Sequence, residues 1–165
     1  MSTALKVAAP IEASDLRRVF GCFPSGVTAV CTLVDGEPVG LAASSFTSVS
    51  LDPPLVSVCL QHSSRTLPLL RHADRVGVTI LSHDQDGICR TLAGAENRFA
   101  GVEWVSGEGG AVFVEDGTAW FECSVYEEFS AGDHTILVLQ VYATGMDTSS
   151  DPLVFHSSRF RRLSS

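Results

Sequence analysis

The sequence has little positive charge. Eleven lysine and arginine residues stand against nineteen aspartate and glutamate residues, which gives a formal net charge of -8 over 165 residues. No basic block or basic helix face stands out along the chain, so we expect no nucleic-acid partner. The densest positive cluster, RFRR at 159–162, lies near the C-terminus, where three arginines are more typical of a solvated surface or a subunit contact than of a phosphate site.

Several segments and motifs with a defined role are also absent. No apolar run reaches the roughly 18 residues needed to cross a bilayer, and the N-terminus has no charged start followed by an apolar run, so we expect no membrane partner. The patterns GxGxxG, GxxxxGK[ST], HExxH and GxSxG do not occur. Their absence argues against a Rossmann dinucleotide site, a P-loop, a zincin protease and a nucleophile-elbow hydrolase.

Cysteine is present, but its pattern argues against disulfide bonds and against a metal site. The five cysteines are odd in number and form neither a CxxC pair nor a Cys/His pair at zinc spacing: Cys22, Cys31, Cys59, Cys89 and Cys123. This favours reduced thiols in the cytoplasm and predicts no metal site. Cys31 and Cys123 lie in apolar runs, where cysteine acts as a small core residue.

What the chain does have is apolar surface. Hydrophobic residues make up 45% and charged residues only 18%, which predicts one domain over residues 11–165 after a flexible tail at 1–10. A single small domain cannot easily bury this much apolar surface in its own core. We therefore expect a homodimer, in which a subunit interface buries part of it.

The apolar pattern predicts mostly strands. A helix begins at Ser14 or Asp15 and ends before Pro24, and its apolar face is expected to pack on a sheet. Asp35-Gly36 marks a hairpin between strands at 27–34 and 39–46. Further strands are predicted at 55–60, 75–81, 111–114, 118–129 and 135–142, with short helices near 67–70 and after 84–86. This pattern indicates a mainly β fold with short helices, built as a closed or nearly closed antiparallel barrel.

The segment from Val39 to Leu60 has the composition of a ligand surface. Ala42 and Ala43 would let backbone amides approach a flat ring or a phosphate closely, and Ser44, Ser45 and Ser50 add short hydroxyl groups. An ordinary hairpin with its serines facing water explains the same composition.

His134 follows Gly132-Asp133 at a predicted turn before an apolar strand, where Asp133 could orient it. A lone histidine at the start of a strand is more often a structural turn residue than a site residue.

Five ordered blocks resemble the flavin reductase-like family. They are PSGVTAVCT at 24–32, VGLAASSFTSVSLDPPLVSVCL at 39–60, NRFAGVEW at 97–104, FEC at 121–123 and GDHTI at 132–136. The resemblance extends from about Leu16 to Leu163, and the family includes reductase components of two-component flavin-dependent monooxygenases. It implies a homodimeric FMN-binding split barrel, Greek-key-like and closed, that uses NADH or NADPH to reduce FMN or FAD for a partner monooxygenase.

The resemblance also implies site residues. His134 would be catalytic on the nicotinamide side, either by holding the carboxamide or by completing protonation of the flavin. Phe160 would cover the ring, and Arg65 would supply positive charge at the phosphate end. The other flavin-binding positions implied are Ser25, Val27, Thr28, Ala42, Ala43, Ser44, Ser45, Ser50, Leu51, Cys59, Ser64 and Thr66.

Other functions on the same fold stay open. The chain could hold flavin or another planar ligand without turnover, oxidise a small amine as pyridoxamine-phosphate oxidases do, or serve only as a structural dimerisation unit. Nothing in these blocks distinguishes FMN from FAD, distinguishes NADH from NADPH, or identifies the oxygenase.

Overall fold

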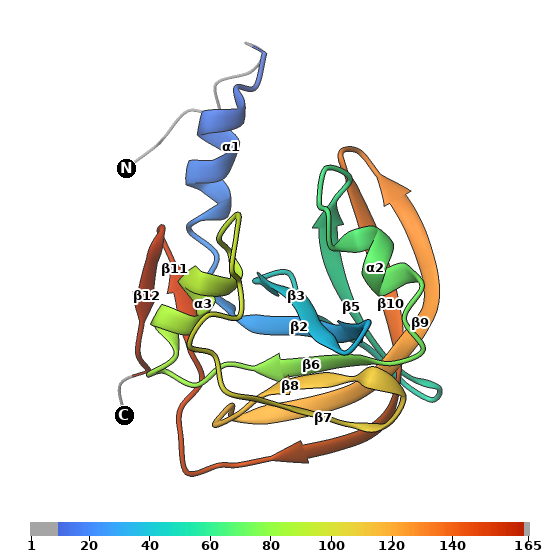
Figure 1. The fold of residues 1–165 in the computed structure, drawn as a ribbon. Coiled ribbons are helices and arrows are strands. Elements are labelled where there is room, and N and C mark those ends of the chain that lie inside the picture. The colour runs from blue at the N-terminus through green and yellow to red at the C-terminus, as the bar shows by residue number, and fades with distance from the viewer. Residues whose placement is uncertain (1–9, 164–165) are drawn as a thin grey trace.

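The computed structural model describes residues 10–163 and consists mostly of antiparallel strands (Figure 1). Its main sheet has seven strands in the order β3-β2-β6-β9-β10-β5-β4. Their bounds are β2 Thr28–Val34, β3 Glu37–Ala43, β4 Thr47–Leu51, β5 Pro54–Gln61, β6 Val76–Ile80, β9 Ala119–Ala131 and β10 His134–Met146. The mainly β class and each of the strands predicted from the sequence are confirmed.

Within residues 10–163, two small sheets and three helices complete the fold. The order β1-β11-β12 forms one sheet, and β7 and β8 form the other. The bounds are β1 Ser25–Gly26, β7 Trp104–Ser106, β8 Val112–Val114, β11 Val154–His156, β12 Arg159–Arg161, α1 Ala13–Phe20, α2 Leu67–Arg71 and α3 Asp86–Leu92, with a 3-10 turn at Glu108–Gly110. The prediction of a tail at 1–10 falls almost wholly outside the described residues.

Left-handed turn residues set the two long hairpins. Asp35 and Gly36, with φ of 53° and 84°, close the β2–β3 hairpin, because this turn type needs positive φ at both central positions. Gly132, with φ of 63°, lies in the turn between β9 and β10. This turn places His134 at the start of β10, directly opposite Gln61 at the end of β5.

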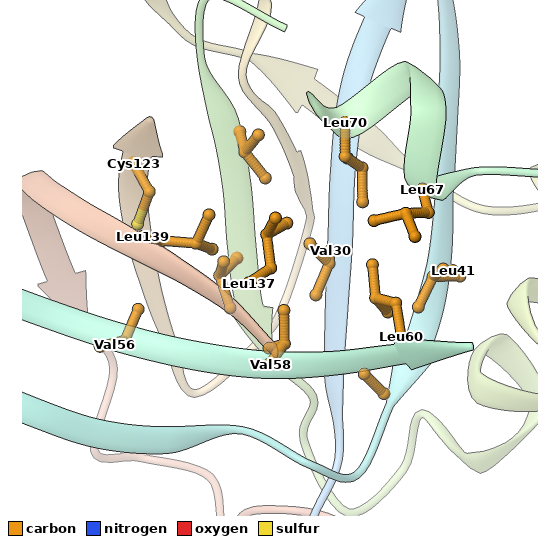
Figure 2. Close-up of a cluster of buried hydrophobic side chains, with 13 residues drawn as sticks. Val30, Leu41, Val56, Val58, Leu60, Leu67, Leu70, Cys123, Leu137 and Leu139 are labelled. Carbon is orange, nitrogen blue, oxygen red and sulfur yellow. The ribbon is translucent and has the colours of Figure 1, made fainter. Parts of the chain in front are cut away.

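One buried cluster shows how far the sheet curls. Leu41 from β3 and Val58 from β5 belong to the same core, together with Val30 and Leu137 (Figure 2). These strands lie near opposite ends of the strand order, so the sheet bends round until both ends cover one core. Within residues 10–163 no strand pairing joins β3 to β5 or β4, so the sheet ends in two edges where a closed barrel was predicted.

A side chain bridges these edges where strand pairing does not. The Ser45 hydroxyl accepts a hydrogen bond from the Cys59 backbone N–H at 2.9 Å and donates to the Cys59 carbonyl at 3.1 Å. The end of β3 is thereby held against β5.

Helix α1 stands away from the sheets (Figure 1). It contains no buried residue, and Val19, Phe20 and the following Phe23 are 66%, 67% and 77% exposed. The sequence-based prediction that this helix packs on the sheet is wrong for the chain taken alone. No helix in the described part of the chain combines the length and apolar character that crossing a bilayer demands.

Candidate functional site

A cavity of about 370 Å³ opens where β3, β5 and β10 meet. Its wall brings together seven residues that the sequence pointed to: Ala42, Ala43, Ser44, Ser45, Cys59, Ser64 and His134. The small side chains at the end of β3 leave room beside the backbone, which a larger residue would fill. The β10–β5 register adds His134 to the same wall.

His134 is oriented by its neighbour. Its Nδ1 lies 2.6 Å from Asp133 Oδ1, while its side chain is 37% exposed and that of Asp133 is 89% exposed. The hydrogen bond to His134, followed by the charge of His134, holds the pKa of the Asp133 carboxyl below its usual value. A carboxylate on Nδ1 favours a proton on that nitrogen, so Nε2 is the ring nitrogen left for a ligand.

The serines of the cavity have different tasks. The Ser45 hydroxyl donates a hydrogen bond to the Cys59 carbonyl, so this serine stabilises the cavity wall. The Ser64 hydroxyl accepts a hydrogen bond from the Thr66 backbone N–H at 3.3 Å, which leaves its proton for a ligand. Ser44 is exposed at the cavity and offers a second hydroxyl.

Arg98 is the cation that sequence reasoning missed. It is partly buried and lines the cavity, and its Nε donates to the Gly94 carbonyl at 2.6 Å. Its Nη1 donates to the Gly40 carbonyl at 3.1 Å and to the Thr66 hydroxyl at 3.0 Å. The block NRFAGVEW contains Arg98, yet nothing in its spacing shows that this guanidinium reaches β3.

Arg65 and Thr66 line a neighbouring cavity of about 510 Å³, which also includes Arg98. Arg65 is exposed, and its Nη2 donates to the Ala95 carbonyl at 2.9 Å. Thr66 is buried, with its hydroxyl accepting from Arg98. Arg98 lines both cavities, whereas Arg65 lines only the second, and the assignment of Arg65 to a phosphate stays a prediction.

The remaining predicted positions lie apart from the cavity. Val27 and Thr28 are 2% and 1% exposed, and the Thr28 hydroxyl donates to the Ala43 carbonyl at 3.0 Å, so both support the wall from within. Ser50 and Leu51 end β4, where Leu51 is 96% exposed.

Two further predicted residues lie near the C-terminal sheet. Ser25 shares a separate cavity of about 330 Å³ with Ser44 and Phe155. Phe160 packs against Phe155, with ring centroids 5.4 Å apart, and lies beneath the Arg90 guanidinium at 5.1 Å.

Comparison with known proteins places these features in a family. The model of the flavin reductase like domain matches residues 20–164. A probable flavin reductase of Rhizobium meliloti is 47% identical over 131 residues, which are 78% of this chain and 42% of that protein. A second Rhizobium meliloti relative is matched over 56% of its length, so the chain spans about half the length of these two relatives.

Other matches cover nearly the full length of both chains. The reductase subunit of a flavin-dependent monooxygenase from Rhodococcus jostii is 31% identical over 93% of this chain and 80% of its own. An NADH:FAD oxidoreductase of Streptomyces globisporus, solved in complex with NAD and FAD fragments, superposes with a TM-score of 0.90 at 35% identity. That superposition covers 96% of this chain and 97% of the other.

Proposed function

The chain belongs to the flavin reductase-like family, and we propose that it reduces FMN or FAD with NADH or NADPH and passes the reduced flavin to a partner monooxygenase. One observation carries the proposal. The cavity at the ends of β3, β5 and β10 combines small residues, free hydroxyls, a partly buried arginine and an oriented histidine. This is what a site needs when the ligands themselves supply the redox chemistry.

The wall residues position the ligands. A bound flavin would supply the hydride acceptor and reduced nicotinamide the hydride, so the protein has to hold two flat rings in contact and keep water from between them. Ala42 and Ala43 leave the β3 backbone accessible to a ring face. Ser44 and Ser64 offer hydroxyl protons to the oxygens of a flavin side chain, and Arg98 offers positive charge to its phosphate.

His134 moves or holds a proton at Nε2. Reduction of flavin by hydride also takes up one proton, and an imidazole whose Nδ1 is fixed by Asp133 can deliver that proton from Nε2. Deprotonated Nε2 can instead accept a hydrogen bond from the nicotinamide carboxamide. In either role His134 acts on turnover more than on flavin affinity.

The Rhodococcus relative is named as the reductase subunit of a flavin-dependent monooxygenase, which supports an oxygenase as the recipient of reduced flavin. The exposure of Ser44 and His134 favours a flavin that exchanges with solution. We place the protein in the cytoplasm, because its cysteines show no paired or metal-binding pattern.

We also propose a homodimer in which the curled sheet of each subunit forms a split barrel whose two edges are joined by side-chain contacts and not by strand pairing. The Ser45–Cys59 contact then marks the seam of the barrel. The exposed apolar side chains of α1 would pack against the second subunit.

The test is oxidation of NADH and of NADPH by the purified protein, followed by absorbance, with FMN, FAD or riboflavin added in turn. Flavin-dependent oxidation is expected. Flavin binding without oxidation of either nucleotide would contradict the reductase and favour a binding module.

A matched pair of variants tests His134. His134→Gln is expected to lower kcat by about a hundredfold where His134 delivers the proton, and by about tenfold where it only holds the carboxamide. KM for flavin is expected to change far less. His72→Gln removes an exposed imidazole at the end of α2 and serves as the control. An equal loss in both variants, or a change confined to KM, would contradict the role of His134.

A further inference from the structure

Asp133 lies between two histidines. The backbone N–H of His62 donates to the Asp133 carbonyl at 2.9 Å, which extends the pairing of β5 with β10 by one residue beyond Gln61 and His134. His62 is therefore the cross-strand neighbour of Asp133, and the Cβ atoms of such a pair lie about 4.5–5.5 Å apart. The Asp133 carboxylate itself binds Nδ1 of His134. One carboxylate thus has an imidazole next to it in the chain and a second imidazole across the strand pair.

The two imidazoles line separate cavities. His134 faces the proposed flavin cavity, whereas His62 lines a cavity of about 510 Å³ between α2 and the β9–β10 hairpin (Figure 1). We call this the α2 cavity, and its other lining residues are Leu67, Pro68, Arg71, Glu128, Ser130 and Thr135. A change of the His62 side chain therefore leaves the wall of the proposed flavin cavity intact.

The charges that face His62 come from three places. Arg71 on α2 and Glu128 on β9 bind each other at 2.8 Å, so their charges largely cancel at His62. The third place is the turn that holds Asp133 and His134. The pKa of the Asp133 carboxyl is lowered first by the hydrogen bond and charge of His134, and to a smaller degree by the charge of His62. Both imidazoles thus act on the same carboxylate.

A charge on His62 opposes a proton on His134. While His62 is neutral, the field of the Asp133 carboxylate acts on His134 alone and favours the protonated ring. A protonated His62 offsets part of that field and repels the His134 cation, so the proton on His134 leaves more readily.

We propose that His62 is a positioning residue for His134, because its charge sets how firmly Asp133 keeps the proton on the His134 ring. The proposal rests on the proposed reductase function, in which His134 delivers a proton from Nε2 or accepts a hydrogen bond there. An imidazole gains charge as the pH falls towards about 6. His62 therefore makes His134 a readier proton donor in mildly acidic solution.

Two pairs of variants test the charge. His62→Arg is positive at every working pH and His62→Gln is neutral, and both keep the main-chain hydrogen bond to Asp133. His72→Arg and His72→Gln make the same change at the end of α2, where the His72 ring contacts the Pro68 carbonyl and does not line the α2 cavity. His62 and His72 are both exposed, so all four variants are expected to show native circular dichroism.

The first arm needs no turnover. Protonation of the His134 ring is followed by NMR over a pH titration at low salt. The midpoint is expected to lie about 0.4 of a pH unit lower in His62→Arg than in His62→Gln, the Coulomb effect of unit charges about 7 Å apart in water. The difference should nearly vanish in about 1 M sodium chloride, where the screening length is about 3 Å. The two His72 variants are expected to differ far less.

The second arm measures turnover. The pH at which kcat is half maximal is expected to be lower in His62→Arg than in His62→Gln by the same amount. This order holds for both roles of His134, because kcat falls with rising pH when the ring donates a proton and with falling pH when Nε2 accepts a hydrogen bond.

Three results would overturn the proposal. They are equal His134 midpoints in the two His62 variants, an equal shift in the His72 pair, and a difference that high salt leaves unchanged, which would show a structural effect. A shift seen by NMR but absent from the kcat profile would overturn the role in turnover. If the unmodified protein reduces no flavin while the NMR midpoints keep the expected order, the reductase function is rejected and the coupling of His62 to His134 stands.

Discussion

The inner face of the sheet and helix α1 both carry apolar side chains but differ in what covers them. Val30 and Leu137 are completely buried, because the curled sheet closes over them. Val19 and Phe20 on α1 are about two-thirds exposed, because no element within residues 10–163 buries them. An apolar pattern thus shows that a face needs covering, and the covering surface can belong to the same chain or to another.

The largest expected effect contrasts one residue from each region. Leu137→Ala leaves a void in the core and should lower the free energy of unfolding by about 2–5 kcal/mol. Phe20→Ala should change it by less than about 0.5 kcal/mol when measured on the monomer by urea denaturation.

The same two variants also test whether a second copy of the chain covers α1. A cost for Phe20→Ala that grows with protein concentration would show that a second copy covers α1, since stability then depends on association.

Two glycines differ in the space that surrounds their backbone. A Cβ on Gly77 in β6 would lie 2.0 Å from the Val112 carbonyl oxygen, whereas a Cβ on Gly26 in β1 meets nothing within 4 Å. Gly77→Ala should therefore destabilise the protein by about 1–3 kcal/mol or more, as overpacking of a core does. Gly26→Ala is the matched control, and thermal unfolding of both variants gives the comparison. Equal melting temperatures would mean that β6 and β8 can separate without cost.

Two thiols report the same difference chemically. Burial raises the pKa of Cys31 to about 12, so its reactive thiolate is scarce at neutral pH. Cys22, just after α1, is exposed. A maleimide added to the native protein should label Cys22 within minutes and leave Cys31 unmodified until the protein unfolds, as read by peptide mass spectrometry. Prompt labelling of Cys31 would show that the core opens on the same timescale.

The smallest effect concerns Asp133, which lies outside both regions. Its pKa is lowered by His134 from the ordinary 3.8, so the ionised form is favoured in the folded state. The resulting stabilisation is complete above the ordinary pKa and is lost as pH falls through the lowered one. At pH 5 the unfolding midpoint of Asp133→Asn should therefore differ from that of the unmodified protein by a small amount, and the two should converge as the pH falls further into acid. If the difference between the two midpoints grew as the pH fell, ionised Asp133 would not be what stabilises the folded state.

Local patterns in the sequence predicted the framework well. Asp35-Gly36 marked the β2–β3 hairpin, and the apolar runs located each of the long strands, because turn chemistry and strand periodicity act over a few residues. The strands β1, β4, β7, β11 and β12 were missed. Four of them have only two or three residues and no period to detect, and β4, with the sequence TSVSL, is mostly exposed and polar, so no apolar run marks it.

The site was predictable in part. Ala42, Ser44 and His134 were found because they lie in dense, ordered blocks near turns, and the structure brings them into one cavity. Val27 and Thr28 lie in an equally dense block but are buried, because both faces of the chain are covered there, as the burial of every residue from 27 to 32 shows. Neighbouring residues of a strand point to opposite faces, and the blocks do not say that both faces are covered.

The sequence by itself determined the family, the mainly β class and the short list of polar residues available for chemistry. Only the tertiary structure decided that Ser45 joins β3 to β5, that Arg98 reaches the cavity from a distant loop, and that α1 lies uncovered. The physical reason is range: turn types and strand periods depend on adjacent residues, whereas these contacts depend on how a seven-stranded sheet curls and brings distant segments together.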